Sequence, residues 1–318
     1  MNSKKLVAMK YIFEMVLIII LSFMYYLNQP IYTSHVVQVP QGSIKKIITH
    51  LADKKYNVSK LDSYLIRLFG SPQSGWIYIG TNKLTKGDFL YKLTHAKAAL
   101  HDIQLIPGET TYIFFDQLAK KLELDREKLQ IWYDKFAKYE EGNFVPDTYK
   151  IPLGISEKEL IILLLRNSYT QMKKVSEKIF GLYDEEKWFQ YVAIASVIQK
   201  ESANLEEMPL VSSVIHNRIK KGMKLQMDGT LNYGKYSHIK VTPKRIREDT
   251  TIFNTYLHKG IPRVPVCNVS FDAIRAAIFP AKTDYLYFMK SKNGTHDFSR
   301  YYSTHLKNIQ NATKRNKK

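Results

Sequence analysis

The hydrophobic positions of the chain begin with one nearly unbroken run close to the N-terminus. Apart from Glu14, residues 11–27 carry only apolar, tyrosine and serine side chains. At ~1.5 Å per residue a helix of this length spans roughly 25 Å, near the lower limit for crossing a bilayer. Glu14 lies four residues after Lys10, so the two can pair close to the lipid headgroups. The run therefore predicts a transmembrane helix.

Charged and aromatic residues at the two ends of this run predict its orientation. Lys5 and Lys10 precede it, and Tyr25 and Tyr26 mark its far end. Because cytoplasmic flanks carry an excess of Lys and Arg, residues 1–10 are expected in the cytoplasm and the rest of the chain beyond the membrane. No small-x-small cleavage site follows the run, which favours an uncleaved single-pass anchor at residues 11–27 over a signal peptide.

Residues 36–122 contain a weak internal repeat of strand and helix patterns. Short alternating segments at 37–39 and 103–105 each lead into a glycine-containing turn, an N-cap residue (Ser43 or Thr110) and a helix with one apolar face. A further strand and a further helix are expected between the two copies. The pattern predicts a small α/β module over this region.

The second part of the chain shows mainly helical periodicity. The expected helices lie at 156–174, 185–202 and 209–221, and two short β segments are expected at 264–269 and 285–289. A helix-rich domain at 125–310, together with the preceding module, makes the predicted fold class α+β. The basic end, residues 311–318, is expected to form a flexible tail.

One carboxylate lies on the apolar face of an expected helix. The stripe that leads to Glu201 at spacings of three or four residues consists of Tyr191, Ile194, Val197 and Ile198. A carboxylate on a buried face is costly to ionise, so its pKa should rise toward the value that a general acid needs near neutral pH. The alternative interpretation is that Glu201 ends its helix and points into water.

A dense set of polar residues follows Glu201 within about two helical lengths. The candidates for a binding cleft are Asn217, Gln226, Asp228, Thr230 and Tyr233. Each could equally satisfy a backbone group of a loop. Asp228 has two specific interpretations, because it can cap the turn before Gly229 or face Glu201 as a second carboxylate.

Motifs in a fixed order cover about two thirds of the chain. Residues 196–202 read SVIQKES, residues 217–234 read NRIKKGMKLQMDGTLNYG and residues 141–149 read EGNFVPDTY. They resemble the patterns S-I-I-E-K-E-T, N-R-L-x-x-G-M-x-L-Q-x-D-P-T-x-x-Y-G and E-G-x-x-x-P-D-T-Y of the endolytic murein transglycosylases, the YceG-like family. Further matches lie at 254–256, 260–262, 276–288 and 294–299.

The resemblance assigns roles to individual residues. It implies that Glu201, which falls on the glutamate of K-E-T, is the catalytic residue. It also adds Asn254 and Tyr256, within the match at 254–256, to the candidate substrate contacts. The chain departs from the family pattern at Gln199, where the pattern has glutamate, at Gly229, where it has proline, and at Arg263. These departures bear on the shape of the loops around the cleft.

The resemblance implies a lytic transglycosylase, a lyase that cleaves the bond between MurNAc and GlcNAc in peptidoglycan. One glutamate can serve as acid and then as base, because the 6-hydroxyl of MurNAc supplies the nucleophile and closes a 1,6-anhydro ring. The implied role is to cut nascent glycan strands and so limit their length. The alternatives are a catalytically silent peptidoglycan-binding scaffold and a muramidase that uses Asp228 together with Glu201.

The resemblance also implies surroundings and partners. It places the chain in the bacterial inner membrane, with the catalytic domain on the periplasmic or extracytoplasmic side. The implied partners are peptidoglycan strands, the membrane and peptidoglycan synthases. Residues 36–122 would form a LysM-like module of a kind that binds GlcNAc-containing glycans. Trp76 or Tyr78 could stack on sugars there, although alternating aromatic residues of a strand are more often core.

Composition narrows the remaining function classes. The net charge of +19 would by itself suggest nucleic-acid binding, but no zinc-finger, RRM or helix-turn-helix signature accompanies it. Positive charge also suits a domain beside an anionic membrane that acts on a polymer bearing carboxylates, and a general lysine bias of the source is the neutral alternative. Cys267 is the only cysteine, which excludes an intrachain disulfide, and no metal or other cofactor is expected.

Overall fold

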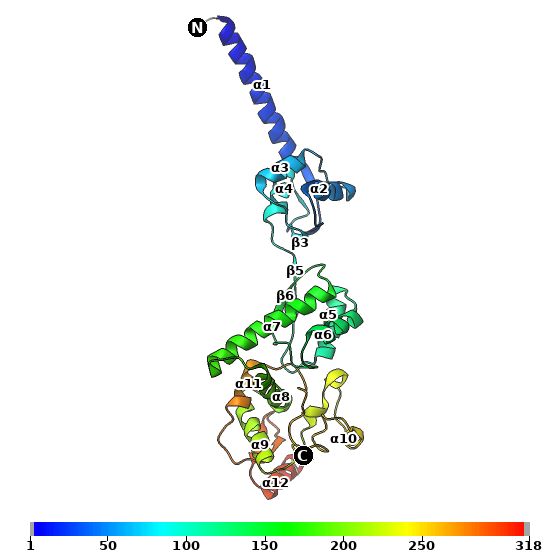
Figure 1. The fold of residues 1–318 in the computed structure, drawn as a ribbon, viewed down its shortest axis with the longest axis vertical. Helices are drawn as coiled ribbons and strands as arrows, with labels where there is room; N and C mark the ends of the chain where they lie inside the picture. The colour runs from blue at the N-terminus through cyan, green and yellow to red at the C-terminus, as the bar shows by residue number, and fades with distance from the viewer. Residues whose placement is uncertain (1–2, 315–318) are drawn as a thin grey trace. The chain divides into compact units, whose positions relative to one another are not determined.

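The computed structural model describes residues 3–314, in which helices are combined with short strands (Figure 1). The described chain divides into two compact units. The first comprises the residues up to His101 together with Lys150–Ile155, and the second comprises Asp102–Tyr149 together with the residues from Ser156 onward. The chain passes from one unit to the other within two paired strands, β5 (Leu100–Gln104) and β6 (Thr148–Pro152).

The first unit begins with a long apolar helix, α1 (Ser3–Leu27). Its most apolar stretch is not covered by any other segment among residues 3–314. The prediction of one N-terminal helix long and apolar enough to cross a membrane is confirmed. The last turn of the helix is attached to the unit, since the Tyr26 hydroxyl donates to Asp62 Oδ1 at 2.9 Å and Leu27 packs against the core. The apolar helix is therefore continuous with a folded domain.

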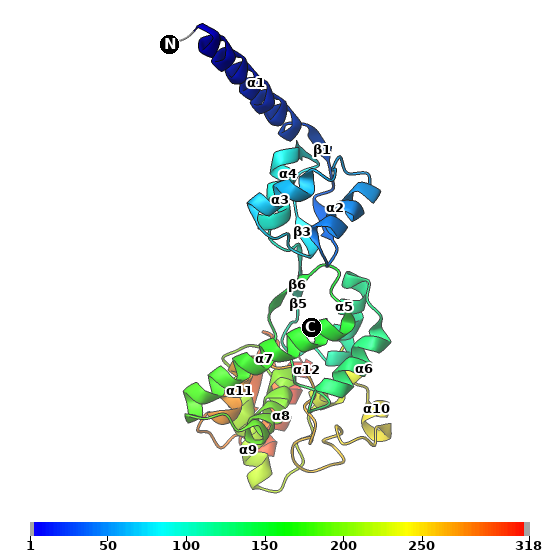
Figure 2. The same ribbon diagram turned by 45° about the horizontal axis from the view of Figure 1, so that its top comes forward.

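Two small antiparallel sheets and three helices complete the first unit (Figure 2). One sheet pairs β1 (Pro30–Tyr32) with β4 (Lys83–Thr85), and the other pairs β2 (Val36–Val39) with β3 (Gly75–Tyr78). The helices are α2 (Ile44–Asp53), α3 (Asp62–Phe69) and α4 (Lys86–His95). Their apolar faces and the inward-facing strand residues share one buried core.

The predicted N-cap residues Ser43 and Thr110 are confirmed, because each hydroxyl accepts the amide hydrogen of the third helical residue. The two copies of the predicted repeat nevertheless lie in different units. Helix α5 (Thr111–Leu122), which forms the end of the second copy, belongs to the second unit. The division at His101 therefore precedes the end of the module expected at residues 36–122.

The second unit consists mainly of helices. Helices α5, α6 (Arg126–Phe136) and α7 (Glu157–Phe180) lie side by side in both views (Figures 1 and 2). The main core lies between α8 (Glu185–Glu201), α9 (Met208–Lys220) and α11 (Phe271–Ile278). The shorter elements are two 3-10 turns, η1 (Asp228–Leu231) and η2 (Gly234–Tyr236), helix α10 (Pro243–Glu248), the antiparallel pair β7 (Tyr287–Lys290) and β8 (His296–Ser299), and helix α12 (Tyr302–Lys314).

The three helices predicted for this region are present, with one difference in length. Helix α7 begins after the capping box of Ser156 and Glu159, but it continues beyond residue 174 to Phe180, where Gly181 ends it in the left-handed conformation. Of the basic end, residues 311–314 belong to α12, and residues 315–318 lie outside the described residues.

The β segment predicted at residues 264–269 is wrong. Most of these residues are buried, but their backbone groups bind side chains and a loop instead of a neighbouring strand. Val266 N donates to the Ser196 hydroxyl at 2.9 Å, and Asn268 N donates to the Glu109 carbonyl oxygen at 2.9 Å. An apolar run indicates burial, whereas its hydrogen-bond partners depend on which elements pack around it.

The buried ion pair of the first unit generates a stability prediction. Lys86 Nζ lies 3.9 Å from Asp62 Oδ2, and both side chains are almost fully buried. Because Asp62→Ala leaves a buried ammonium unpaired, it should lower the free energy of unfolding by about 3–5 kcal/mol. Adding Lys86→Met should recover the part of the loss that is due to the unpaired ammonium, but not the part due to the lost hydrogen bonds of Tyr26 and Ser59 to Asp62. Urea denaturation of the full chain in detergent measures both effects, and an Asp62→Ala protein as stable as wild type would contradict this role of the pair.

Candidate active site

Helix α8 positions Glu201 at its C-terminal end. The Asp184 carboxylate caps its start by accepting from Lys187 N, and an apolar surface that includes the fully buried Val192 and Ala195 packs it against α9 and α11. Glu201 is the last helical residue, and its side chain is half-buried. The structure combines the two interpretations left open by the sequence: Glu201 does end its helix, but it points against a turn of the chain.

That turn is residues 228–229, at the start of η1. Gly229 N donates a hydrogen bond to Glu201 Oε1 at 2.7 Å. The pKa of Glu201 is raised to about 7. Burial is the main cause, the Gly229 amide and the charge of Arg218 act to lower the pKa, and the charge of Asp228 contributes to its rise. At neutral pH, Glu201 is therefore present in both protonation states and can donate or accept a proton.

Two threonines hold the turn in place. Met227 N donates to the Thr255 hydroxyl at 3.0 Å, and the Thr230 hydroxyl donates to the Met227 carbonyl oxygen at 2.7 Å. Both threonine side chains are buried. Thr230, which the sequence suggested as a possible cleft residue, thus binds the backbone that carries Asp228 and Gly229.

Gln226 and Asp228 present their side chains on the exposed side of this turn. Gln226 has a φ of 51°, which is uncommon for a residue other than glycine and is a form of strain that often marks functional positions. Within residues 3–314 its side chain has no hydrogen-bond partner. The Asp228 carboxylate accepts from the Tyr256 hydroxyl at 2.7 Å. Glu201, Gln226, Asp228 and Tyr256 are therefore associated with one turn.

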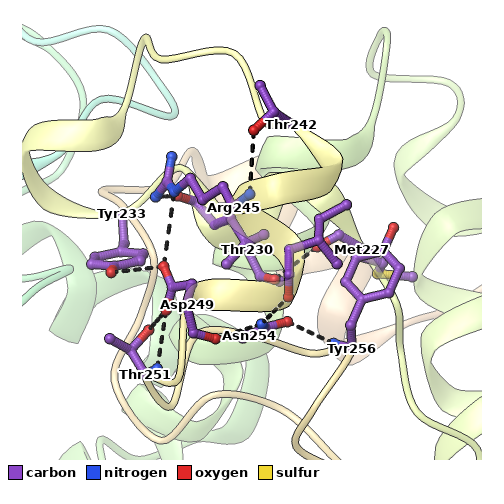
Figure 3. A network of polar contacts seen from close by, with 11 residues as sticks. Met227, Thr230, Tyr233, Thr242, Arg245, Asp249, Thr251, Asn254 and Tyr256 are labelled. Carbon is purple, nitrogen blue, oxygen red and sulfur yellow. Dashed lines mark hydrogen bonds and ion pairs between the residues drawn. The ribbon is translucent and has the colours of Figure 1, made fainter.

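Tyr233 and Asn254 belong to a supporting network around Asp249 (Figure 3). The Tyr233 hydroxyl donates to Asp249 Oδ2 at 3.0 Å, and the Asn254 amide group donates to the Asp249 carbonyl oxygen at 2.6 Å. Arg245 pairs with the same carboxylate. These two candidates fix the loop that leads from η2 to Tyr256, so their polar groups are already engaged within the protein.

Asn217 is likewise engaged by backbone groups. Its amide nitrogen donates to the carbonyl oxygens of Thr283 and Tyr285 at 2.9 and 3.0 Å. The neighbouring Arg218 is buried, and it donates to the carbonyl oxygens of Leu225 and Leu286, both at 2.6 Å. Arg218 belongs to the polar set that follows Glu201 in the sequence, but its burial was not predicted, although it lies seven residues after the buried Val211 and so on the same helical face.

A second carboxylate with a raised pKa lies in the motif at residues 141–149. Burial raises the pKa of Glu141 to about 7, although Thr111 and Gly142 donate to it. Thr111 N and Gly142 N are 2.9 and 3.0 Å from its oxygens, so this carboxylate caps the start of α5. Sequence reasoning did not single it out, because the partner Thr111 is 30 residues away. Its engagement indicates a structural role.

No group of three or more His, Cys, Asp or Glu residues within the described part of the chain could hold a metal ion. The only cysteine, Cys267, is fully buried. The groups that act on Glu201 are the Gly229 amide, the Asp228 carboxylate and the Arg218 guanidinium.

Comparison with known proteins identifies the family. The model of the YceG-like family matches residues 37–311. The chain belongs to the YceG-like family. The family that the sequence motifs indicated is thus confirmed.

Two relatives of this YceG-like chain carry names and come from bacteria. A Bacillus subtilis (strain 168) protein named endolytic murein transglycosylase is 26% identical over 303 residues, covering 85% of this chain and 82% of that relative. A protein of the same name from Streptococcus pneumoniae serotype 2 is 31% identical over 212 residues, covering 64% of this chain but only 36% of that relative. The chain therefore matches about a third of the streptococcal protein.

A crystal structure shares the fold. A putative yceG-like protein from Listeria monocytogenes superposes with a TM-score of 0.54 at 23% sequence identity, covering 88% of this chain and 99% of that chain. The mixed helix and strand fold predicted from the sequence is therefore a YceG-like fold.

One departure from the YceG-like pattern has a clear structural consequence. The side-chain oxygen of Gln199 accepts from the Ser270 amide at 3.2 Å and from the Ser270 hydroxyl at 2.8 Å. Ser270 is the N-cap of α11, so Gln199 connects α8 to the start of that helix. Position 199 has a structural task here and does not supply a second acid.

The proximity of Asp228 to Glu201 generates a testable prediction. Because a nearby negative charge disfavours ionisation, Asp228→Asn should lower the pKa of Glu201. Carbon-13 NMR titration of the glutamate carboxyl groups measures the shift, with Glu201→Gln to assign the signal. Asp53→Asn, an exposed change in the first unit, should leave the pKa unaltered. An unchanged or higher Glu201 pKa in Asp228→Asn would contradict the proposed electrostatics.

Proposed function

We propose that the chain is a membrane-anchored endolytic transglycosylase of peptidoglycan in which Glu201 transfers the proton. The observation that carries this proposal is the half-buried Glu201 carboxyl group, with a pKa raised to about 7, beside an exposed polar turn. A general acid works best when its pKa lies near the operating pH. The names of the relatives, endolytic murein transglycosylase, supply the substrate class and the reaction type.

The proposed reaction begins with the protonated form of Glu201. It donates its proton to the glycosidic oxygen between MurNAc and GlcNAc, and the bond from that oxygen to C1 of MurNAc breaks. The carboxylate then accepts the proton of the MurNAc 6-hydroxyl, whose oxygen bonds to C1 and closes the 1,6-anhydro ring. Water is not consumed, and Glu201 returns to its starting state. One residue with a pKa near neutrality suits both steps.

The side chains around the turn have different proposed tasks. Gln226 and Asp228 are exposed beside Glu201, so they are the proposed sugar contacts, and Tyr256 orients Asp228 through its hydrogen bond. Asn217, Thr230, Tyr233 and Asn254 already bind other parts of the protein, so they are proposed to position the loops of the cleft.

Helix α1 is proposed to anchor the chain in the inner membrane, with the N-terminus in the cytoplasm. Its length and apolar character support spanning, and the lysines in its N-terminal part support this orientation. The catalytic unit would then lie outside the cytoplasm, where peptidoglycan strands are made. Terminating the growth of nascent strands, in contact with peptidoglycan synthases, is the cellular role that fits this location.

The first unit is proposed to be a LysM-like module that contacts glycan. Trp76 and Tyr78 alternate with the buried Ile77 on β3, so they share the outward face of the strand. Tyr78 is exposed and can stack on a sugar, whereas Trp76 is half-buried and packs closely against Gly154. The sequence had favoured a core role for these aromatic residues.

A two-carboxylate muramidase is the second candidate function, because the charge of Asp228 acts on Glu201. In such a hydrolase Asp228 would act as base or nucleophile, and the product would have a reducing end. A catalytically silent scaffold is less well supported, since nothing in binding alone requires a half-buried carboxyl group with a pKa near neutrality.

Product analysis tests the proposed function. Peptidoglycan strands are incubated with the full chain in detergent, wild type beside Glu201→Gln, and the fragments are analysed by mass spectrometry. Wild type should give 1,6-anhydroMurNAc ends, and Glu201→Gln should reduce the rate by about 10²–10⁴-fold or more, because it can neither donate nor accept the proton.

The control and the contradicting outcomes follow from the same assay. Glu206→Gln, an exposed change near the end of α8, should retain wild-type activity. Fragments with reducing ends would indicate the muramidase and make Asp228 the next target. The absence of cleavage by wild type, with an active family member as positive control, would indicate the scaffold.

A further inference from the structure

We propose that the backbone amide of Gly229 is a positioning group of the catalytic centre, which binds one oxygen of the Glu201 carboxyl group and reserves the other for the transferred proton. This inference rests on the proposed function. It goes beyond the identity of the acid, because it assigns separate tasks to the two carboxyl oxygens. It also assigns a role to a position at which this chain departs from the YceG-like pattern, since the proline of that pattern has no N–H group.

The contact is short and uses a donor that would otherwise be unpaired. Gly229 N lies 2.7 Å from Glu201 Oε1. Gly229 is the second residue of η1, and amide groups in the first turn of a helix have no carbonyl partner within it. The turn cannot shift freely, because Thr255 and Thr230 bind the backbone of Met227 on its other side. The amide therefore restrains the carboxyl group from a fixed support.

Glycine is required here by the closeness of α8 and not by its own backbone conformation. A Cβ atom at position 229 would lie 2.8 Å from Glu201 Oε1, 2.8 Å from Lys200 Cβ and 3.0 Å from the Lys200 carbonyl oxygen. Gly229 does not have the positive φ that would by itself favour glycine. Only a residue without a Cβ lets this amide reach Glu201 without displacing the end of the helix.

The hydrogen bond assigns the tasks of the two oxygens. An oxygen that accepts from an N–H group is the one that lacks the proton when the carboxyl group is neutral. The proton of Glu201 is therefore carried on Oε2, which donates it to the glycosidic oxygen and later accepts the proton of the 6-hydroxyl. When Glu201 is ionised, the same amide stabilises the carboxylate. One fixed donor thus serves both half-reactions.

Other groups act on Glu201 from the elements packed around it. Asp228 on η1 opposes its ionisation, and Arg218 on α9 favours it. The Tyr256 hydroxyl donates to Asp228, and Lys200 precedes Glu201 with its ammonium group directed to Ser237. Two variants that both add a Cβ atom at position 229, one with and one without the N–H group, separate the contribution of the amide from that of the added atom.

The test compares Gly229→Ala with Gly229→Pro in the full chain. Both variants add a Cβ, but only proline removes the N–H group. Relative to wild type, Gly229→Pro should move the alkaline limb of the kcat/KM profile upward by about one pH unit, since a donor to the ionised form is lost, and should lower kcat by about tenfold. Gly229→Ala, which keeps the N–H group, should change both quantities less. A Gly229→Pro protein with the wild-type pH profile and the wild-type kcat would overturn the proposal.

A second measurement does not depend on the folding or activity of these variants. In wild-type protein labelled with nitrogen-15, the Gly229 amide proton should move downfield as the pH rises through the pKa of Glu201, because its hydrogen bond strengthens. This titration should be absent in Glu201→Gln. A Gly229 signal that does not titrate in wild type would refute the positioning role. Failure of wild type to form anhydro ends would refute the proposed function and leave this readout intact.

Discussion

The close approach of residues 228–229 to the end of α8 is the constraint on which the rest of the candidate site depends. It buries Glu201 enough to raise its pKa to about 7, and it brings one hydrogen-bond donor to the carboxyl group. If the turn lay farther away, water would replace the amide and the carboxyl group would titrate closer to its ordinary range. A glycine at position 229 and the threonines that hold the turn make the approach possible.

The surrounding fold keeps that distance fixed. Helix α8 is packed against α9 and α11, and α11 presents the small buried residues Ala273, Ala276 and Ala277. The buried Arg218 binds backbone carbonyl groups on both sides of the site, in the segment before Gln226 and in the segment before β7. A charged residue is rarely buried without partners, and here the carbonyl groups provide them. Two loops that are far apart in the sequence are thereby joined to α9, which packs against α8.

Local patterns predicted the features that depend on neighbouring residues. The apolar run of α1 and the N-caps Ser43 and Thr110 are properties of a few consecutive positions, and these predictions were confirmed. The spacing of apolar residues before Glu201 also indicated its partial burial. These features need no knowledge of how distant segments pack.

Contacts between distant segments could not be predicted in the same way. The bond between Gly229 and Glu201 joins residues 28 positions apart, and the bonds of Asn217 to residues 283 and 285 span more than twice that distance. Asn217 therefore looked available for a ligand when its partners were unknown. The buried run at 264–269 was taken for a strand for the same reason, because an apolar pattern does not specify its hydrogen-bond partners.

The most direct test of the central claim, that one glutamate cleaves the strand without water, is cleavage in water enriched in oxygen-18. Peptidoglycan strands are digested briefly by the wild-type chain, and the new ends are analysed by mass spectrometry before exchange at reducing ends can occur. The single-glutamate mechanism predicts anhydro ends that contain no oxygen-18. One oxygen-18 atom in each new end would show that water attacks C1, and it would contradict the single-glutamate mechanism.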